Sequence, residues 1–180
     1  MERGKAMQLL PFTEEMQQPV RSFFDKCFAA LGWTYEPNGR HRDTADIEAY
    51  YLRDGCFWCL FEDDLLVGTV GLRTMDAENK IFELKRLFVL PEYQRKGYGG
   101  RLLECAIRYA KEKNYNAICL DTRRELRSAQ RLYRKNGFQR VKQYNGNDHA
   151  EEFFELKIMK KERHSLYETK RQRNNGCYRN

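Results

Sequence analysis

The order of apolar and polar positions in the first half of the chain predicts a strand, a helix and then a group of strands. An apolar run at residues 7–10 predicts the first strand. The segment Thr13-Glu14-Glu15 is typical of a helix start, and we expect the helix over about 18–31, ending at Gly32. After a loop over 33–43, the pattern predicts a short helix and three long strands, at about 44–52, 57–62, 65–73 and 80–89. Short polar turns join these strands, so they are expected to be antiparallel.

The second half of the chain alternates helices and strands. Residues 97–113 predict an amphipathic helix, whose apolar face is formed by Leu102, Leu103, Ala106, Ile107 and Ala110. The elements expected after it are a buried strand at 115–121, a helix at 125–136 and two strands at 138–144 and 151–159. The predicted fold class is therefore α/β, with a mixed, mostly antiparallel sheet, helices on both faces and one β-α-β crossover.

Length and composition fit one domain, expected over residues 1–159. The chain has 180 residues, 41% of them hydrophobic, and a formal net charge of +7. Residues 160–180 hold seven Lys/Arg and two Asp/Glu, which gives +5 and predicts a poorly ordered basic tail. Nucleic-acid binding through this tail is the weaker interpretation. No apolar run is long enough for a membrane span, and the N-terminus lacks a signal-peptide pattern, so we expect a cytoplasmic protein.

The cysteines do not predict a metal site. Cys56-Phe-Trp-Cys59 has the spacing of a metal or redox motif, but no second ligand pair lies at a suitable distance along the chain. The motif falls in a predicted strand, where residues three apart point to opposite faces. We therefore expect buried, reduced cysteines and no metal at positions Cys27, Cys56, Cys59, Cys105, Cys119 and Cys177.

The most informative segment is Leu90-Pro-Glu-Tyr-Gln-Arg-Lys-Gly-Tyr-Gly-Gly-Arg101. A proline ends a strand, and a glycine-rich turn opens a helix, whose first backbone N–H groups are unpaired and attract anions. The pattern lacks both the Lys-Ser/Thr of a Walker loop and the third glycine of a dinucleotide fingerprint. On these residues alone, a phosphate-binding turn and a merely structural helix start remain equally open.

Two motifs resemble the signatures of the GNAT superfamily of N-acetyltransferases. Gln94-Arg-Lys-Gly97-Tyr-Gly99 is similar to the family's Gln/Arg-x-x-Gly-x-Gly/Ala motif. The segment Ser128-Ala129-x-x-Leu132-Tyr133-x-x-x-Gly137-Phe138 resembles its second signature, and the element order fits over about residues 7–159. The resemblance implies an acyl-CoA-dependent N-acetyltransferase that uses acetyl-CoA and moves its acetyl group to a primary amine by direct attack.

The resemblance also implies how acetyl-CoA is bound. Backbone N–H groups of residues 95–100 would hold the pyrophosphate, and the strand end at Phe88 and Val89 would pair with the pantetheine arm and polarise the thioester. The residues implied in coenzyme A binding are Phe88, Val89, Gln94, Arg95, Lys96, Gly97, Tyr98, Gly99 and Gly100.

Two side chains are candidates for proton transfer. Tyr133 matches the family's position for the acid that protonates the leaving thiolate, although a tyrosine on an apolar helix face also packs as a core residue. Glu83 is offset from Gln94 like the general base of the histone-acetylating branch, and the alternative is a solvated strand charge. Simple alternation places Glu83 on the strand face of Leu87 and Val89.

The amine acceptor is not readable from the sequence. Family acceptor sites use loops that correspond here to about 32–46 and 144–150, so the expected lining is Trp33, Tyr35, Tyr144 and Asn147. His41 and His149 flank the same cleft and are interpreted as surface residues. A small-molecule acceptor is favoured over a peptide or protein, and a homodimer is left open. The alternative function is a non-catalytic acyl-CoA-binding or sensor domain.

Overall fold

The computed structural model describes residues 6–158, and the predicted basic tail at 160–180 lies outside this range. The elements in chain order are β1 (Met7–Pro11), η1 (Glu14–Met16), α1 (Gln17–Ala30), η2 (Arg42–Thr44), η3 (Glu48–Leu52), β2 (Cys56–Glu62), β3 (Leu65–Asp76), β4 (Ile81–Val89), η4 (Pro91–Tyr93), α2 (Tyr98–Glu112), β5 (Ala117–Thr122), α3 (Arg127–Lys135), β6 (Gln139–Arg140) and β7 (Glu152–Lys157). The α/β fold class predicted from the sequence is confirmed.

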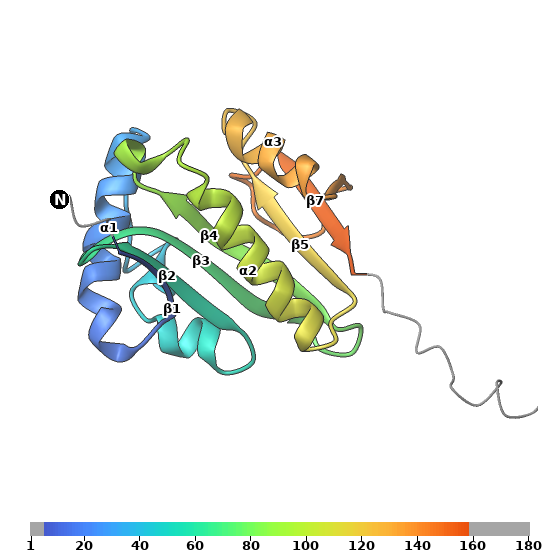
Figure 1. Ribbon diagram of the computed structural model, residues 1–180. Coiled ribbons are helices and arrows are strands. Elements are labelled where there is room, and N and C mark those ends of the chain that lie inside the picture. The colour runs from blue at the N-terminus through green and yellow to red at the C-terminus, as the bar shows by residue number, and fades with distance from the viewer. Residues whose placement is uncertain (1–5, 159–180) are drawn as a thin grey trace, which may run out of the picture.

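One seven-stranded sheet organises the protein, with the strand order β1-β2-β3-β4-β5-β7-β6 (Figure 1). Each neighbouring pair is antiparallel except β4 and β5, which are parallel and joined through α2. The parallel pairing is short: it runs from Ile81 opposite Ala117 to Glu83 opposite Cys119. Beyond Glu83 the rest of β4 has no pairing with β5, so the sheet opens along this edge.

Helices cover both faces of the sheet. On one face, Phe82, Leu84 and Leu120 pack with Leu102 and Leu103 of α2. The core on the other face joins α1 to the sheet and is rich in aromatic side chains, including Phe23, Phe24, Phe28, Tyr51 and Phe57. Each fully buried Leu or Phe side chain stabilises the fold by about 1.5–3 kcal/mol relative to exposure. The two cores together hold β4 in place from both faces of the sheet.

A β-bulge at Arg86 changes the face on which the second half of β4 lies. Gly71 of β3 pairs with Lys85, but Thr69 pairs with Phe88, so β4 carries an extra residue. Arg86 adopts a left-handed conformation, with φ of 57°, and its carbonyl accepts a hydrogen bond from the Thr69 hydroxyl at 2.8 Å.

The bulge corrects one prediction. Leu87 and Val89 pack on the α2 side of the sheet, and Phe88 packs on the α1 side. Phe82 and Leu84 also lie on the α2 side, so Glu83 between them faces α1. Glu83 therefore does not share a face with Leu87 and Val89, because alternation is interrupted at the extra residue.

Two segments differ from the pattern-based prediction. The strand expected at 138–144 is limited to Gln139–Arg140, because Tyr144 and Asn145 leave the sheet edge and form hydrogen bonds with Glu83. The short helix expected at 44–52 is divided into η2 and the π-helical turn η3. In the second segment, Asp43 of η2 forms hydrogen bonds with Arg86 of β4.

The five cysteines of the described range are free, and all are buried except Cys56, which is half-buried. Cys177 lies outside this range. Cys59 lies in the core on the α1 side, and Cys56 packs on the α2 side, as expected for strand residues three apart. Within residues 6–158, no group of three His, Cys, Asp or Glu side chains is arranged to hold a metal ion. In the same range, no helix combines the length and apolarity needed to cross a bilayer.

Candidate functional site

The glycine-rich turn at residues 94–100 presents a row of free backbone donors. Arg95 and Gly97 both adopt left-handed conformations, with φ of 62° and 84°, and α2 starts directly after them. Among the described residues, no acceptor takes a hydrogen bond from the backbone N–H groups between Arg95 and Gly100. Free N–H groups at a helix N-terminus form a site for an anion such as phosphate.

The side chains around the turn leave this row open. A Cβ added at Gly97 would have no heavy atom within 4 Å, and one at Gly99 would meet only Leu132, at 3.4 Å. Lys96 turns away: its ammonium lies 4.5 Å from the Tyr93 ring centroid and 3.6 Å from a Glu62 oxygen. The open space above the glycines is therefore available to a ligand that approaches the backbone.

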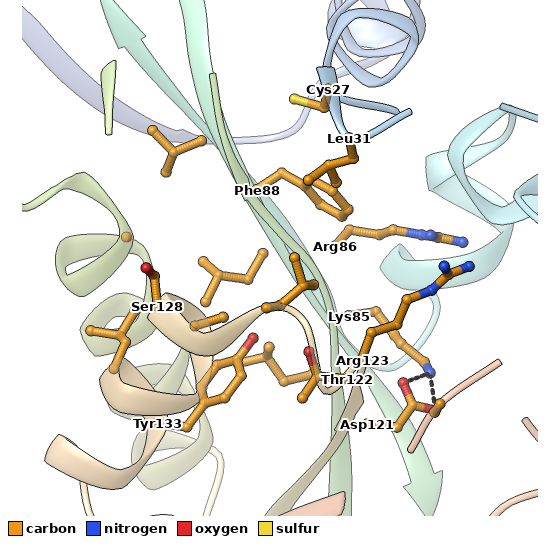
Figure 2. Close-up of a pocket in the computed structure, with 18 of the residues that line it drawn as sticks. Cys27, Leu31, Lys85, Arg86, Phe88, Asp121, Thr122, Arg123, Ser128 and Tyr133 are labelled. Atoms are coloured by element: carbon orange, nitrogen blue, oxygen red, sulfur yellow. Dashed lines mark hydrogen bonds and ion pairs between the residues drawn. The ribbon is translucent and has the colours of Figure 1, made fainter. Parts of the chain in front are cut away.

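The turn forms one end of a cleft of about 1280 Å³. The cleft continues along the open edge of β4, between the end of α1 and α3 (Figure 2). Residues of the loops after α1 and β6 line its other end. It brings together most of the residues predicted from the sequence: Trp33, Glu83, Phe88, Val89, Gln94, Arg95, Gly97, Tyr98, Gly99, Gly100, Tyr133, Tyr144 and Asn147. Lys96 and Tyr35 are the two predicted site residues that do not line it.

Tyr35 supports the cleft from the aromatic core. Its hydroxyl lies 2.7 Å from the Thr44 hydroxyl, and its ring packs on Phe28 and His41 at centroid distances of 5.3 and 5.8 Å. The side chain therefore holds His41 in place rather than contacting a ligand in the cleft.

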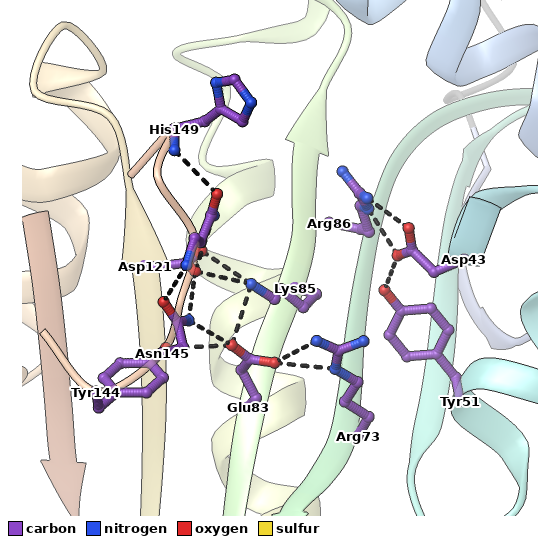
Figure 3. Close-up of polar contacts among 11 residues, drawn as sticks. Asp43, Tyr51, Arg73, Glu83, Lys85, Arg86, Asp121, Tyr144, Asn145 and His149 are labelled. Atoms are coloured by element: carbon purple, nitrogen blue, oxygen red, sulfur yellow. Dashed lines mark hydrogen bonds and ion pairs between the residues drawn. The ribbon is translucent and has the colours of Figure 1, made fainter. Parts of the chain in front are cut away.

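A buried ion pair fixes the bulge of β4. The Arg86 guanidinium donates hydrogen bonds to both Asp43 oxygens, at 2.8 and 2.5 Å, and the Tyr51 hydroxyl donates a third at 2.5 Å (Figure 3). Burial of Asp43 would raise the pKa of its carboxyl group, but the hydrogen bonds and charge of Arg86 outweigh this and lower it. The pair thus stays ionised under the strand segment that lines the cleft.

Glu83 is the centre of a polar network at the point where β4 and β5 separate. Arg73 donates to one carboxylate oxygen from Nε and Nη2, at 2.9 and 2.6 Å. The other oxygen lies 3.1 Å from the Lys85 ammonium and accepts hydrogen bonds from Tyr144 and Asn145 (Figure 3). Because Glu83 is only 4% exposed, these contacts hold its charge in a defined position.

Asp121 completes the network from β5. Its oxygens lie 2.9 and 3.0 Å from the Lys85 ammonium, and one oxygen also accepts from Asn145 and Asn147. Burial opposes ionisation of Asp121, but Lys85 and the two amides outweigh it and lower the pKa. Lys85 therefore bridges two carboxylates, one on each of the diverging strands.

Tyr133 lies on α3 with its hydroxyl directed into the cleft (Figure 2). Its ring packs against Phe138 and Phe154, at centroid distances of 5.8 and 6.0 Å, and the residue is 5% exposed. Within residues 6–158 the hydroxyl has no hydrogen-bond partner. Burial and, secondarily, the charge of Asp121 raise the pKa of Tyr133, so the hydroxyl keeps its proton.

Three residues from two distant loops meet across the far end of the cleft. The Trp33 indole N–H donates to Glu125 at 3.2 Å, and the Arg123 guanidinium carbon lies 4.0 Å from the Trp33 ring centroid. His41 lies in the same loop as Trp33, and its Nδ1 accepts a hydrogen bond from the backbone N–H of Glu36. Burial, followed by the charges of Arg86 and Arg40, lowers the pKa of His41 to about 4, so this ring is neutral near pH 7.

A comparison with known proteins assigns the family. The model of the GNAT acetyltransferase family matches residues 18–138, about two thirds of the chain and all of the turn and α3. The chain belongs to the GNAT acetyltransferase family. Its structure resembles a GNAT-family acetyltransferase from Staphylococcus aureus Mu50, with 25% identity and a TM-score of 0.78, covering 86% of this chain and 100% of that one.

A further GNAT structure supports the fold alone. The PaiA N-acetyltransferase of Thermoplasma acidophilum, solved with coenzyme A, is 20% identical, with a TM-score of 0.64 over 85% of this chain and 99% of that one.

Curated relatives match a shorter stretch of this GNAT chain. It is 34% identical to the probable N-acetyltransferase camello of Xenopus tropicalis over 102 residues, which cover 55% of this chain and 46% of that protein. It is 36% identical to the N-acetylaspartate synthetase of Danio rerio over 103 residues, 56% of this chain and 36% of that protein. The chain thus spans less than half the length of these relatives.

Several charged residues of this GNAT site were not predicted from the sequence. They are Arg73, Lys85, Arg86, Asp121 and Arg123, all of which line the cleft. One signal was present: Glu83-Leu-Lys-Arg86 places three charges inside a strand of a predicted central sheet, where unpaired charges are costly. Their partners, Asp43 and Asp121, lie 35 or more positions away in sequence, so the pairs are visible only after folding.

Proposed function

We propose that this GNAT protein is an N-acetyltransferase that moves the acetyl group of acetyl-CoA directly to a primary amine. The observation that supports this most strongly is the shared cleft: free donors of the 95–100 turn, the unpaired edge of β4, Tyr133 and Glu83 all line it. Acetyl transfer from acetyl-CoA needs a site for the phosphates, a strand edge for the pantetheine arm and groups that transfer protons. The cleft contains a candidate for each. The relatives are named N-acetyltransferase and N-acetylaspartate synthetase. From these names we propose for this chain only the transfer of an acetyl group to a nitrogen atom.

The turn and the strand edge are proposed to bind acetyl-CoA. The N–H groups from Arg95 to Gly100 would hold the pyrophosphate, and the space above Gly97 leaves room for it. The edge of β4 at Phe88 and Val89 would form hydrogen bonds with the pantetheine arm, because no β5 residue pairs with it. The Val89 carbonyl accepts a hydrogen bond from the Gln94 side chain at 3.1 Å, so a ligand that uses this carbonyl would replace Gln94. A backbone N–H at this edge would stabilise the negative charge on the thioester oxygen.

Two side chains are proposed to move protons. Tyr133 holds a protonated hydroxyl in the cleft and would protonate the departing thiolate. Glu83 would take the proton of the attacking amine through a water molecule. The free cysteines of the described range fit a reducing compartment, and we propose the cytoplasm.

A glycine substitution tests the binding turn. Gly99→Glu would place a bulky, negatively charged side chain beside the anion site, and we expect it to weaken acetyl-CoA binding at least tenfold, about 1.4 kcal/mol. Gly99→Ala is the control, because its Cβ meets Leu132 at an ordinary 3.4 Å, and its affinity should stay within about threefold of the wild type. Titration calorimetry gives both values. Unchanged affinity in a folded Gly99→Glu protein would show that the ligand phosphates bind elsewhere.

A substitution that removes the charge of Glu83 tests its role. We expect Glu83→Gln to lower kcat/KM by roughly 10²-fold, because the amide cannot accept the proton of the attacking amine. Glu78→Gln, on an exposed turn, controls for loss of one negative charge. Thiol release from acetyl-CoA across a panel of amines is the assay. A folded Glu83→Gln enzyme with wild-type kcat/KM would remove Glu83 from the mechanism, and a wild type that binds acetyl-CoA but releases no thiol would favour a sensor domain.

A further inference from the structure

Arg123 is a cation held in the cleft with most of its hydrogen-bonding capacity unused. It stacks on Trp33, and its side chain is 32% exposed. Its ion-pair partner, Glu125, lies 3.6 Å away and is itself 60% exposed, so the attraction is weak. Among the described residues, the guanidinium donates no hydrogen bond. An arginine offers five N–H donors in a planar fork that matches a carboxylate.

The surroundings of Arg123 favour a negatively charged ligand. In Figure 2 the side chains of Arg86 and Arg123 both extend toward the same side of the pocket. Arg40 lies on the opposite loop, where it contacts His149 at 3.1 Å. Asp43, Glu83 and Asp121, the acids of this region, are each paired with Arg86, Arg73 or Lys85. No buried acid of the described cleft is therefore left to neutralise Arg123.

We infer that the acceptor is a small amine with a free carboxylate, of the α-amino acid type, and that Arg123 binds this carboxylate. The inference rests on the proposed function and specifies its acceptor. Trp33 holds the guanidinium over its ring, with the guanidinium carbon 4.0 Å from the ring centroid, and the remaining N–H groups can donate to both oxygens of a carboxylate. In an α-amino acid one carbon separates the carboxylate from the amine, so anchoring the first orients the second.

The position of Arg123 suits this role. Arg123 directly follows the end of β5, two residues after Asp121, which pairs with Lys85 beside Glu83. Arg123, Glu83 and Tyr133 line the same cleft, so the amine of an anchored acid would lie in the cleft that holds both proton-transfer candidates. Leu31 and Met75, both 38% exposed, add apolar surface to the same cleft and can accommodate a side chain.

The reaction with such an acceptor balances without further reagents. The ammonium of the acceptor first releases one proton to solvent, and the free amine nitrogen then attacks the thioester carbon, so that the C–N bond forms and the C–S bond breaks. The nitrogen gives its second proton by water to Glu83, and the thiolate takes a proton from Tyr133. Return of the Glu83 proton to Tyr133 through water restores both side chains. The products are the N-acetyl amino acid and free coenzyme A, and the carboxylate on Arg123 is unchanged.

Matched acid and amide pairs test the inference on the full chain. Leucine is compared with leucinamide, and aspartate with its α-amide, by calorimetry with and without coenzyme A and by thiol release from acetyl-CoA. We expect the acids to bind at least about tenfold more tightly than the amides and to be turned over with higher kcat/KM. The amides have the more easily deprotonated amine, so a preference for the acids cannot come from the nucleophile.

Two neighbouring arginines provide the variant and its control. Arg123→Gln should remove the preference for acids and leave the KM for acetyl-CoA unchanged. Arg124→Gln should keep the preference, because Arg124 is 69% exposed, pairs with Glu151 and Glu152 and does not line the cleft. Equal binding of acids and amides, a preference that survives in Arg123→Gln, or faster turnover of peptide N-termini than of amino acids would each overturn the inference. Arg123-dependent binding of acids with no thiol release from any amine would support the anchor and reject the proposed function.

Discussion

Replacing Tyr133 with phenylalanine is expected to lower turnover by roughly 10²–10⁴-fold, which is the usual contribution of a positioned general acid to the rate. The substitution removes one hydroxyl and keeps the ring contacts with Phe138 and Phe154. The hydroxyl has no partner in the described residues, so its loss breaks no hydrogen bond there, and stability should change by about 1 kcal/mol or less. KM for acetyl-CoA should change much less than turnover, because the hydroxyl acts as charge develops on sulfur.

The control for this experiment is a tyrosine that is hydrogen-bonded away from the cleft. Tyr115 stacks on Phe82 and shares a 2.6 Å hydrogen bond with Thr74, so Tyr115→Phe should cost some stability and leave turnover intact. The measurement is steady-state thiol release at saturating substrates, with a good acceptor so that chemistry limits the rate. Full turnover of Tyr133→Phe under these conditions would leave thiolate protonation to water, and family membership would be unaffected.

The sequence was sufficient to predict the α/β fold class and the position of the turn. The predicted bounds of α1 and α2 agree with the structure to within about two residues. Local start and stop signals such as Gly32 determined the prediction for α1, and the glycine-rich turn with one apolar face determined it for α2. The turn was predictable because proline, glycines and the following amphipathic helix are all local signals. Motif resemblance then placed Tyr133 and Glu83, and the structure brings both to one cleft.

The remainder of the site depends on contacts between distant residues. No local pattern predicts the left-handed conformation of Arg86, since a non-glycine residue adopts it when surrounding contacts compensate for the strain. Here Asp43 supplies those contacts from a loop far away in sequence. In the same way, the loop after β6 leaves the sheet because Asn145 and Asn147 bond to Asp121. Both features form only when the chain folds, so no local sequence pattern predicts them.

Breaking the Arg86–Asp43 pair is expected to have the largest effect on stability. Asp43→Asn leaves the Arg86 charge buried without its counter-ion, and we expect a loss of about 3–5 kcal/mol in the free energy of unfolding. The side chains of Arg86 and Asp43 are 16% and 9% exposed, so solvent screens them little. Glu36→Gln is the control: Glu36 and its partner Arg40 are 40% and 38% exposed, so solvent screens the pair and its loss should change the free energy of unfolding little. Urea denaturation measures both, and a small effect for Asp43→Asn would contradict the prediction.

A triple variant separates stability from catalysis at the bulge. Arg86→Met with Asp43→Leu and Tyr51→Phe replaces the whole buried group by apolar side chains, which is often neutral or stabilising because no charge or hydroxyl is left unpaired. If the ion pair also shapes the edge of β4, the triple variant should recover stability to within about 2 kcal/mol of the wild type and still turn over about tenfold or more slowly. Phe88 and Val89 follow the bulge directly, so a shift there moves the backbone proposed to contact the thioester. Wild-type turnover in a stable triple variant would show that the pair maintains the fold and that the strand edge keeps its position without it.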